Sequence, residues 1–269
     1  MSGSGRFRLM GIINVTPDSF SDGGATFDHG VAVDHALKLV EDGADIIDVG
    51  GESTRPYAQP VEEQEEINRV IPVISALRAR SEVAISIDTT KASVARRALA
   101  AGAAMINDIS ALRADPEMIA TLKQSSCEVV IMHMQGSPAT MQDAPHYNSV
   151  IDEIIDFFRD RLEVIGAAGI DLNRVIIDPG IGFGKTLAHN LSIIKNLSRF
   201  AELGRPLLLG HSRKRFMGEL TGLEAHERDT ITAVISALCF NQGVYIFRVH
   251  DVAATNRALK IASAIGDAT

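Results

Sequence analysis

The chain has 269 residues, a length that fits one large domain or two small ones. Hydrophobic residues make up 46% of it, which is enough to fill a sizeable core. The formal net charge of −8 argues against a nucleic-acid binder, because such proteins normally carry a basic face. We therefore expect no nucleic-acid partner.

No segment has the features of a targeting or membrane sequence. No apolar stretch of signal-peptide length follows Met1, and no run approaches the roughly 18 apolar residues of a membrane helix. Cys127 and Cys239 lie far apart without metal-type spacing, so we interpret them as reduced core thiols. These features predict a cytoplasmic protein with no membrane association.

Short apolar runs alternate with longer stretches of helical periodicity. The runs are rich in Ile and Val, which is typical of parallel strands buried on both faces. We expect strands at 9–14, 45–50, 83–88, 104–109, 128–134, 175–180, 206–212 and 245–251. Apolar residues three and four apart predict helices at 29–41, 61–79, 91–101, 116–125, 150–167, 189–203, 230–241 and 252–265.

This alternation of eight strands with eight helices predicts a parallel sheet. An open, doubly wound sheet is the competing arrangement. Eight even repeats favour closure into an α/β fold of the (β/α)8 TIM-barrel type, whose usual length of about 250 residues matches. Since no change in composition marks a linker, we predict one domain over residues 1–269, with residues 1–5 flexible.

A hydrogen-bonding side chain stands at the end of every predicted strand. These side chains are Asn14, Asp48, Asp88, Asn107 with Asp108, His133, Asp178, Ser212, and Arg248 with His250. A single one has a simpler explanation, because Asp88 could merely cap the helix that follows it. In a barrel, however, all of these ends converge on one mouth, where enzymes of this fold keep their active sites. The pattern therefore predicts an active site there.

Basic residues follow the last two predicted strands. Ser212-Arg213-Lys214-Arg215 comes after the seventh, and Arg248-Val249-His250 closes the eighth. The loops at these positions are the usual phosphate site of a barrel, and a helix beginning at Lys214 would add N–H groups. The segment 50–55 adds glycines and an arginine. Three such segments predict more than one bound phosphate, with a solvated basic patch as the alternative.

Two other motifs are weaker. Gly184-Lys185-Thr186 ends like a P-loop, but Pro179 stands where that motif needs glycine. A hydrolase zinc site made of His133, His211 and His250 is conceivable, yet the first strand supplies Asn14 instead of paired histidines.

Several segments resemble, in order, the signatures of the dihydropteroate synthase family. The two longest are MGIINVTPDSFSDGG at 10–24 and DVGGESTRP at 48–56. They are followed by SIDT at 86–89, IND at 106–108, MHMQG at 132–136, DPGIGFGK at 178–185, SRK at 212–214 and RVHD at 248–251. The resemblance covers about residues 9–265 and implies a pterin-binding barrel that is usually a homodimer.

The resemblance implies a transferase of folate biosynthesis. It would join 4-aminobenzoate to 6-hydroxymethyl-7,8-dihydropterin diphosphate, forming 7,8-dihydropteroate and releasing pyrophosphate. Such a reaction needs a leaving group and a stabilised cation at the pterin methylene more than it needs a general base. By this resemblance, the catalytic residues are Asp88, Asn14 and Lys214.

The resemblance also implies the pterin site. Its residues would be Asp88, Asn107, Met132, Asp178, Phe183 and Lys214. Asp178 would accept hydrogen bonds from the 2-amino group and ring N3, with Asn107 beside it, while Asp88 faces N8 and Lys214 reaches the carbonyl oxygen and N5. The two apolar members would line the ring faces or the benzoate path, with core packing as their alternative role.

The remaining substrate groups are assigned in the same way. The diphosphate, with Mg²⁺ as cofactor bound at Asn14, would contact Asn14, Thr54, Arg55, Arg248 and His250. The residues for 4-aminobenzoate would be Phe20, Pro56, Ser212 and Arg215. The chain departs from many relatives at Arg215, where a small hydroxyl residue is frequent, and at Tyr57, where glycine is common.

Two other functions stay open at this level. A methyltetrahydrofolate-dependent methyltransferase is a barrel with a related pterin pocket, but it has no need of the two basic clusters. A non-catalytic pterin binder would be expected to have lost Asn14 or the long signature motifs, which are intact here.

Overall fold

The computed structural model of the protein describes residues 7–16, 29–53, 58–137 and 140–268. In these ranges the strands are β1 Arg8–Asn14, β2 Ile46–Gly50, β3 Ala84–Asp88, β4 Met105–Asp108, β5 Glu128–Met132, β6 Val175–Asp178, β7 Leu207–Leu209 and β8 Val244–Val249. The α-helices are α1 His29–Glu41, α2 Glu63–Arg80, α3 Ala92–Ala100, α4 Glu117–Lys123, α5 Val150–Ala167, α6 Leu187–Lys195, α7 Arg215–Thr221, α8 Asp229–Cys239 and α9 Val252–Gly266.

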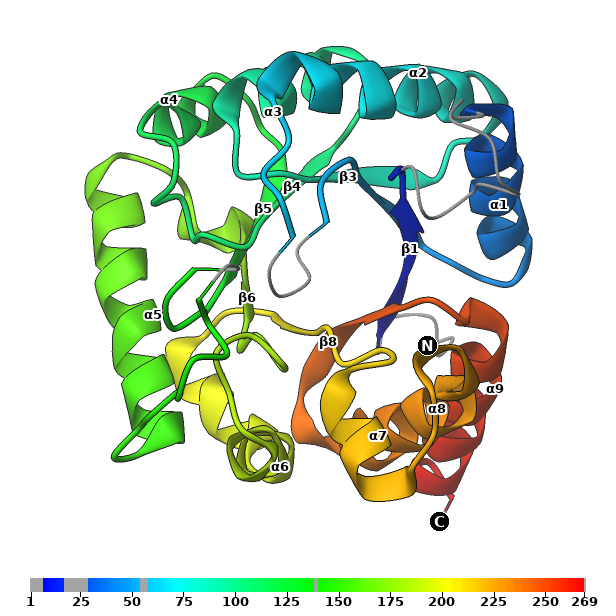
Figure 1. Ribbon diagram of the computed structural model, residues 1–269, viewed down its shortest axis with the longest axis vertical. Helices are drawn as coiled ribbons and strands as arrows, with labels where there is room; N and C mark the ends of the chain where they lie inside the picture. The colour runs from blue at the N-terminus through cyan, green and yellow to red at the C-terminus, as the bar shows by residue number, and fades with distance from the viewer. Residues whose placement is uncertain (1–6, 17–28, 54–57, 138–139, 269) are drawn as a thin grey trace.

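The strands close into a barrel. They follow one another around it in sequence order from β1 to β8, every neighbouring pair is parallel, and β8 returns to pair with β1. The helices form a ring outside the strands (Figure 1). The predicted TIM barrel is confirmed, and the open sheet is excluded.

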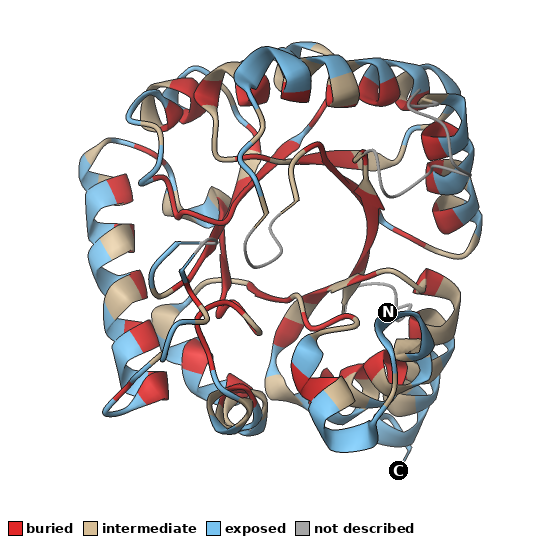
Figure 2. Ribbon diagram, in the orientation of Figure 1, coloured by how far each residue is buried: buried red, intermediate tan, exposed pale blue. Residues whose placement is uncertain are grey.

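Two apolar layers hold the barrel together. Met10, Ile46, Met105, Val130 and other inward-facing strand residues fill the interior. A larger cluster packs the outward-facing strand residues against the helices. Figure 2 shows the consequence, with strands buried along most of their length and helices buried mainly on the side that faces the barrel. This double burial explains why the strands read as continuous apolar runs.

The two-residue period of a strand decides which side chains reach the mouth of the barrel. In β1, the inner-core residue Met10 is followed on the same face by Ile12 and then Asn14. In β8, Ile246 is followed in the same way by Arg248. One step above the inner layer, the other strands place Asp48, Ser86, Asn107, Met132 and Asp178, and Gly210 follows directly after β7.

Most differences from the expected elements are shifts of one to three residues at element ends. The stretch 189–203 is a larger exception, because it is split into α6 and a 3₁₀ segment, Leu197–Leu203. The break falls at Asn196, whose φ of −116° and ψ of 24° are not helical and whose side chain caps the carbonyl of Ser192. The short helix α7 was foreseen only as a helix beginning at Lys214, and it begins one residue later.

Within the described ranges, none of the helices combines the length and the apolar character needed to cross a membrane.

Candidate active site

A cavity of about 1460 Å³ opens at the carboxyl ends of the strands. The predicted site residues that line it are Asn14, Asp88, Phe183, Ser212, Lys214, Arg215, Arg248 and His250. They come from β1, β3 and β8, from the loops after β6, β7 and β8, and from the first residue of α7. The convergence predicted from the strand ends is therefore confirmed for Asn14, Asp88, Ser212, Arg248 and His250.

Arg248 is the centre of the polar network in this cavity. Its Nε donates to Asp48 Oδ2 and its Nη2 donates to Asp88 Oδ2, both at 2.6 Å. Asp48 Oδ2 also accepts from Asn107 Nδ2 at 3.1 Å. One arginine therefore ties together side chains from β2, β3, β4 and β8, which fixes the Asp88 carboxylate and leaves it only 13% exposed.

The charges of this network shift the pKa of its members. Burial, helped by the nearby charge of Asp48, raises the pKa of Asp88 to about 7 against the opposing charge of Arg248. Burial lowers the pKa of Arg248, but the two carboxylates outweigh it and raise that pKa above its usual value. The guanidinium therefore stays charged, and Asp88 is poised to change its charge near neutral pH.

Lys214 and Phe183 form the opposite wall. The Lys214 ammonium lies 3.9 Å from the centre of the Phe183 ring, a cation–π contact. Burial, followed by the charge of Arg248, lowers the pKa of Lys214 to about 8. Gly182 allows this approach, because it has a φ of +83° and a Cβ there would lie 3.0 Å from Lys214 Cδ.

Asn107, Met132 and Asp178 lie beneath the lining of the cavity rather than in it. They are only 4%, 2% and 6% exposed. Asp178 is nevertheless close to the lining, since a Cβ on the lining residue Gly210 would lie 3.2 Å from its Oδ2. Burial raises the pKa of Asp178, although its Oδ1 accepts from the Gly180 N–H at 2.8 Å.

The expectation that His133 points into the mouth is wrong. β5 ends at Met132, so the strand period turns His133 outward, where its ring packs on Phe157 of α5. Its Nδ1 lies 3.1 Å from the buried ammonium of Lys185, which also donates to the carbonyl of Phe183 at 2.8 Å. Burial, together with the charge of Lys185, lowers the pKa of His133 to about 2, so the ring is neutral and structural.

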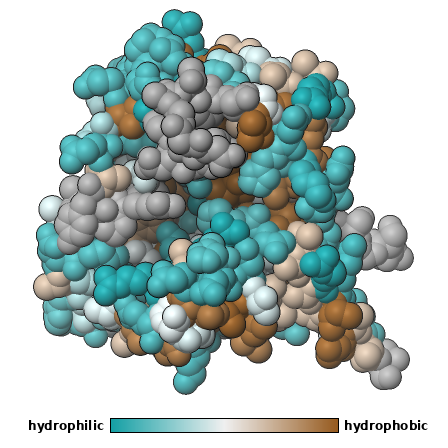
Figure 3. Space-filling model, turned by 45° about the vertical axis from the view of Figure 1, so that its right-hand side comes forward, coloured by the Kyte–Doolittle hydropathy of each residue, from teal (hydrophilic) through white to brown (hydrophobic). Residues whose placement is uncertain are grey.

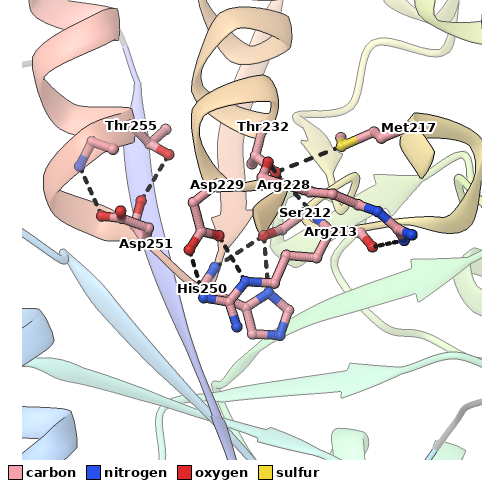
Figure 4. Close-up of polar contacts among 10 residues, drawn as sticks. Ser212, Arg213, Met217, Arg228, Asp229, Thr232, His250, Asp251 and Thr255 are labelled. Atoms are coloured by element: carbon pink, nitrogen blue, oxygen red, sulfur yellow. Dashed lines mark hydrogen bonds and ion pairs between the residues drawn. The ribbon is translucent and has the colours of Figure 1, made fainter. Parts of the chain in front are cut away.

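Two arginines of the predicted basic cluster form ion pairs with carboxylates of the same chain. Arg213 makes a two-pronged ion pair with Asp229, at 2.7 Å for each contact (Figure 4). Arg215 is 82% exposed and pairs with Glu219 one turn along α7. Of the three cations in this segment, Lys214 is the one that reaches over the Phe183 ring.

Ser212 and His250 belong to the same corner of the cavity. Ser212 Oγ lies 2.9 Å from His250 Nδ1 and accepts from the His250 backbone N–H at 3.1 Å (Figure 4). These contacts join the loop after β7 to the end of β8, so the residues predicted for the benzoate and diphosphate groups are neighbours.

Four predicted site residues, Phe20, Thr54, Arg55 and Pro56, lie outside the described residues, as does Tyr57.

The donors at the mouth do not make a zinc site. The described ranges contain no group of three or more His, Cys, Asp or Glu side chains able to hold a metal ion. His211 points away from the mouth, with Nε2 at 3.0 Å from both the Thr232 carbonyl and Ser236 Oγ on α8. Mg²⁺ needs a different set of ligands from zinc, because it is held by one or two protein oxygens together with substrate phosphates and water. The amide oxygen of Asn14, on the cavity wall, fits that pattern.

Known proteins resemble this chain over almost its whole length. Residues 10–250 match the family model of pterin binding enzymes. The dihydropteroate synthase of Haemophilus influenzae is 43% identical over 261 residues, covering 97% of this chain and 94% of the relative. The chain belongs to the dihydropteroate synthase family. This family consists of transferases in folate biosynthesis, which sets aside the methyltransferase and zinc-hydrolase interpretations.

Solved structures of the dihydropteroate synthase family share the fold. The Yersinia pestis enzyme, in complex with a sulfonamide drug, has a TM-score of 0.93 at 44% identity and covers 98% of this chain and 95% of its own. The Xanthomonas albilineans enzyme with 4-aminobenzoic acid has a TM-score of 0.92 at 48% identity, with 98% and 94% covered. A second structure of the Xanthomonas albilineans enzyme, with 7,8-dihydropteroate, has a TM-score of 0.89 at 45% identity, with 98% and 95% covered.

Sequence reasoning gave no role to three residues that shape the site. Asp48 was noted only as a strand end, yet it holds both Arg248 and Asn107. Lys185 stands out in the sequence only in the incomplete P-loop and at the end of the signature segment 178–185, and no motif marks Asp229. Asp48 could have been found from its position two residues after the inner-core residue Ile46. The partners of Lys185 and Asp229 are distant in sequence, so no local pattern indicates them.

Proposed function

We propose that this protein is a dihydropteroate synthase that joins 6-hydroxymethyl-7,8-dihydropterin diphosphate to 4-aminobenzoate and releases pyrophosphate. The observation that carries this proposal is the meeting of Asp88, Arg248, Lys214 and Phe183 around one cavity. These side chains supply a carboxylate, an aromatic face and cations at a single mouth. Family membership supports the reaction, and relatives of this fold bind 4-aminobenzoate and 7,8-dihydropteroate.

The pterin ring would occupy the deeper part of the cavity. Asp178 would accept from the 2-amino group and N3, and Asn107 would be held in place for the neighbouring ring atoms by its bond to Asp48. Phe183 would cover one ring face while Lys214, lying over Phe183, reaches the ring carbonyl and N5. Met132 would lie beneath the pterin ring and pack in the small apolar cluster that contains Phe183.

Asp88 would stabilise the charge that develops during the reaction. In the proposed SN1-like route, the bond between the pterin methylene and the diphosphate oxygen breaks first and leaves a cation delocalised into the ring. The Asp88 carboxylate, fixed by Arg248 and directed at N8, lowers the energy of that cation. The aryl amine of 4-aminobenzoate then attacks the methylene carbon.

The diphosphate would lie against Asn14, Arg248 and His250, with Thr54 and Arg55 of the second signature segment adding to this set. Asn14 would hold Mg²⁺, which neutralises negative charge on the departing diphosphate when it is bound. Arg248 would contribute positive charge of its own, and its bonds to two carboxylates fix the direction of its guanidinium.

The 4-aminobenzoate carboxylate would bind near Ser212. The Ser212 hydroxyl is held by His250, and Arg215 stands at the rim of the same cavity. Phe20 and Pro56 would cover the benzoate ring. Sulfonamides copy the aryl amine, so the same site would bind them, as the drug complex of the Yersinia pestis relative supports.

We further propose a homodimer. Large apolar side chains are exposed on three helices that lie together in Figure 1, namely Leu220 on α7, Val234 and Leu238 on α8, and Ile261 and Ile265 on α9. Figure 3 shows hydrophobic side chains at the lower edge of one face. Large exposed apolar side chains that gather on one side of a protein are a usual sign of an interface. Sedimentation measurements would test this, and a monomer at micromolar concentration would contradict it.

A cytoplasmic location is also proposed. Cys127 and Cys239 are both free and buried, and reduced thiols are typical of the cytosol.

The activity is tested by mixing the protein with pterin diphosphate, 4-aminobenzoate and Mg²⁺. We expect pyrophosphate and dihydropteroate to form in equal amounts, and Asp88→Asn to lower the rate strongly. A wild-type protein that binds pterin but releases no pyrophosphate would instead be a non-catalytic pterin binder.

A further inference from the structure

Arg213 has an unusual backbone conformation at an important place. It stands between Ser212 and Lys214, and its φ is +57°. This left-handed region is unfavourable for any residue with a Cβ, so the turn needs support from its surroundings. The positions of the Ser212 hydroxyl and the Lys214 ammonium depend on that turn.

The N-terminal part of α8 supplies the support (Figure 4). Asp229 accepts from Nε and Nη2 of Arg213, each at 2.7 Å. Thr232 Oγ1 accepts from the Arg213 backbone N–H at 3.2 Å, and Arg228 Nη1 donates to the Arg213 carbonyl at 3.1 Å. The side chain, the N–H and the carbonyl of Arg213 are thus each held by a different residue of one helix end.

The charge of Arg213 is already balanced. The bond to Asp229 is the main reason why the pKa of Arg213 is raised, and it uses one whole edge of the guanidinium. Although Arg213 belongs to the cavity wall, an anion that bound it would have to compete with a carboxylate of ideal two-pronged geometry.

We propose that Arg213 is a positioning residue, whose guanidinium is clamped by Asp229 so that the left-handed turn presents Ser212 and Lys214 to the substrates. It does not bind a substrate anion itself. This inference rests on the proposed function, because it assigns a purpose to the turn within that reaction. It also gives Asp229 a place in the machinery of the site.

Two substitutions at one position separate positioning from direct binding. Arg213→Gly and Arg213→Ala both remove the cation, but only glycine adopts a φ of +57° without cost. We expect the KM for 4-aminobenzoate to rise about tenfold in Arg213→Ala and only about threefold in Arg213→Gly, because alanine alone disfavours the left-handed turn. Equal losses in the two variants would overturn the proposal.

Asp229→Asn should change the KM for 4-aminobenzoate in opposite directions, depending on whether Arg213 positions the turn or binds the substrate. If Asp229 clamps Arg213, the weaker amide partner loosens the turn and the KM for 4-aminobenzoate rises about fivefold. If Arg213 binds substrate directly, releasing it from Asp229 lowers that KM, which would contradict the proposal. Asp152→Asn and Arg199→Ala, from an exposed ion pair on the far side of α5, are matched controls that should leave KM unchanged.

Crystal structures of the two Arg213 variants test the positioning role independently of enzyme activity. In crystals we expect the 2.9 Å contact between Ser212 Oγ and His250 Nδ1 to persist in Arg213→Gly and to be lost in Arg213→Ala. If the wild-type protein released no pyrophosphate, the proposed function would fail, while the clamp would still be judged by this contact. A contact retained in both variants, or a fall in Tm with no change in KM, would show that Arg213 only stabilises the fold.

Discussion

The two sides of the barrel mouth are built in different ways. On the acidic side, Asp48, Asp88 and Asn107 stand on β2, β3 and β4, so strand register alone sets their positions. On the basic side, Ser212 and Lys214 come from a loop after the three-residue strand β7 and depend on contacts from α8. One cavity can therefore combine a wall made of strand residues with a wall made of a loop that another helix holds in place. Arg248 couples the two sides electrostatically, since it pairs with both carboxylates and its charge lowers the pKa of Lys214.

Removal of the metal should give the largest difference between the two sides, because it should stop turnover and leave pterin binding nearly unchanged. Treatment with EDTA is expected to abolish turnover, because Asn14 and the cations around it cannot balance the departing diphosphate without Mg²⁺. Binding of free 6-hydroxymethyl-7,8-dihydropterin should change by less than about threefold, a free-energy difference of about 0.7 kcal/mol. Calorimetry and the pyrophosphate assay measure the two effects, and stripped protein with full activity would refute the metal assignment.

Asp178→Asn should weaken only the binding of the pterin. The amide keeps the shape but offers a donor where the pterin also donates, which costs about 1–3 kcal/mol when the groups are buried. We expect the affinity for hydroxymethyl-dihydropterin to fall at least about tenfold in calorimetry. Asp156→Asn, on the exposed face of α5, is the matched control. An unchanged affinity would remove Asp178 from the pocket.

The dependence of activity on pH tests the link through Arg248. In the proposed reaction Asp88, with a pKa of about 7, acts as the anion, and Lys214, with a pKa of about 8, acts as the cation. Since a carboxylate gains its charge as pH rises and an ammonium loses it, kcat/KM should rise up to about pH 7 and fall above about pH 8.

Asp48→Asn sharpens this test. Removing the Asp48 charge takes away one cause of the raised Asp88 pKa and leaves Arg248 to Asp88 alone. The acidic limb should therefore move to lower pH while the alkaline limb stays closer to its original position. An acidic limb that does not move would show that another group than Asp88 controls it.

The smallest effect is expected at the rim of the basic side. Arg215 is 82% exposed, and exposed ion pairs contribute at most about 1 kcal/mol. Arg215→Ser should change the ratio of sulfonamide to 4-aminobenzoate affinity by no more than about fivefold, with a smaller change in kcat. Titrations with pterin and pyrophosphate present, where drug binding should be stronger, measure this ratio. A tenfold loss of kcat would place Arg215 in the reaction itself.

The repeating part of the structure was determined by the sequence alone. Eight apolar runs between helical stretches predicted the closed barrel, and the signature segments predicted the family. Asn14, Asp88, Lys214, Arg248 and His250 were also expected at the mouth, where they line the cavity. These features depend on local periodicity, which a strand or helix imposes on its own residues.

The pairing of side chains was decided only by the tertiary structure. Asp48 and Arg248 are 200 residues apart, and barrel closure makes them an ion pair. His133 faces outward because it is one position out of phase with Val130, which points into the barrel, and side chains alternate along β5. Arg213 pairs with Asp229, sixteen residues away, and no motif in the sequence indicated that partner. Such contacts depend on the register and packing of whole elements, and a pattern along the chain carries no information about them.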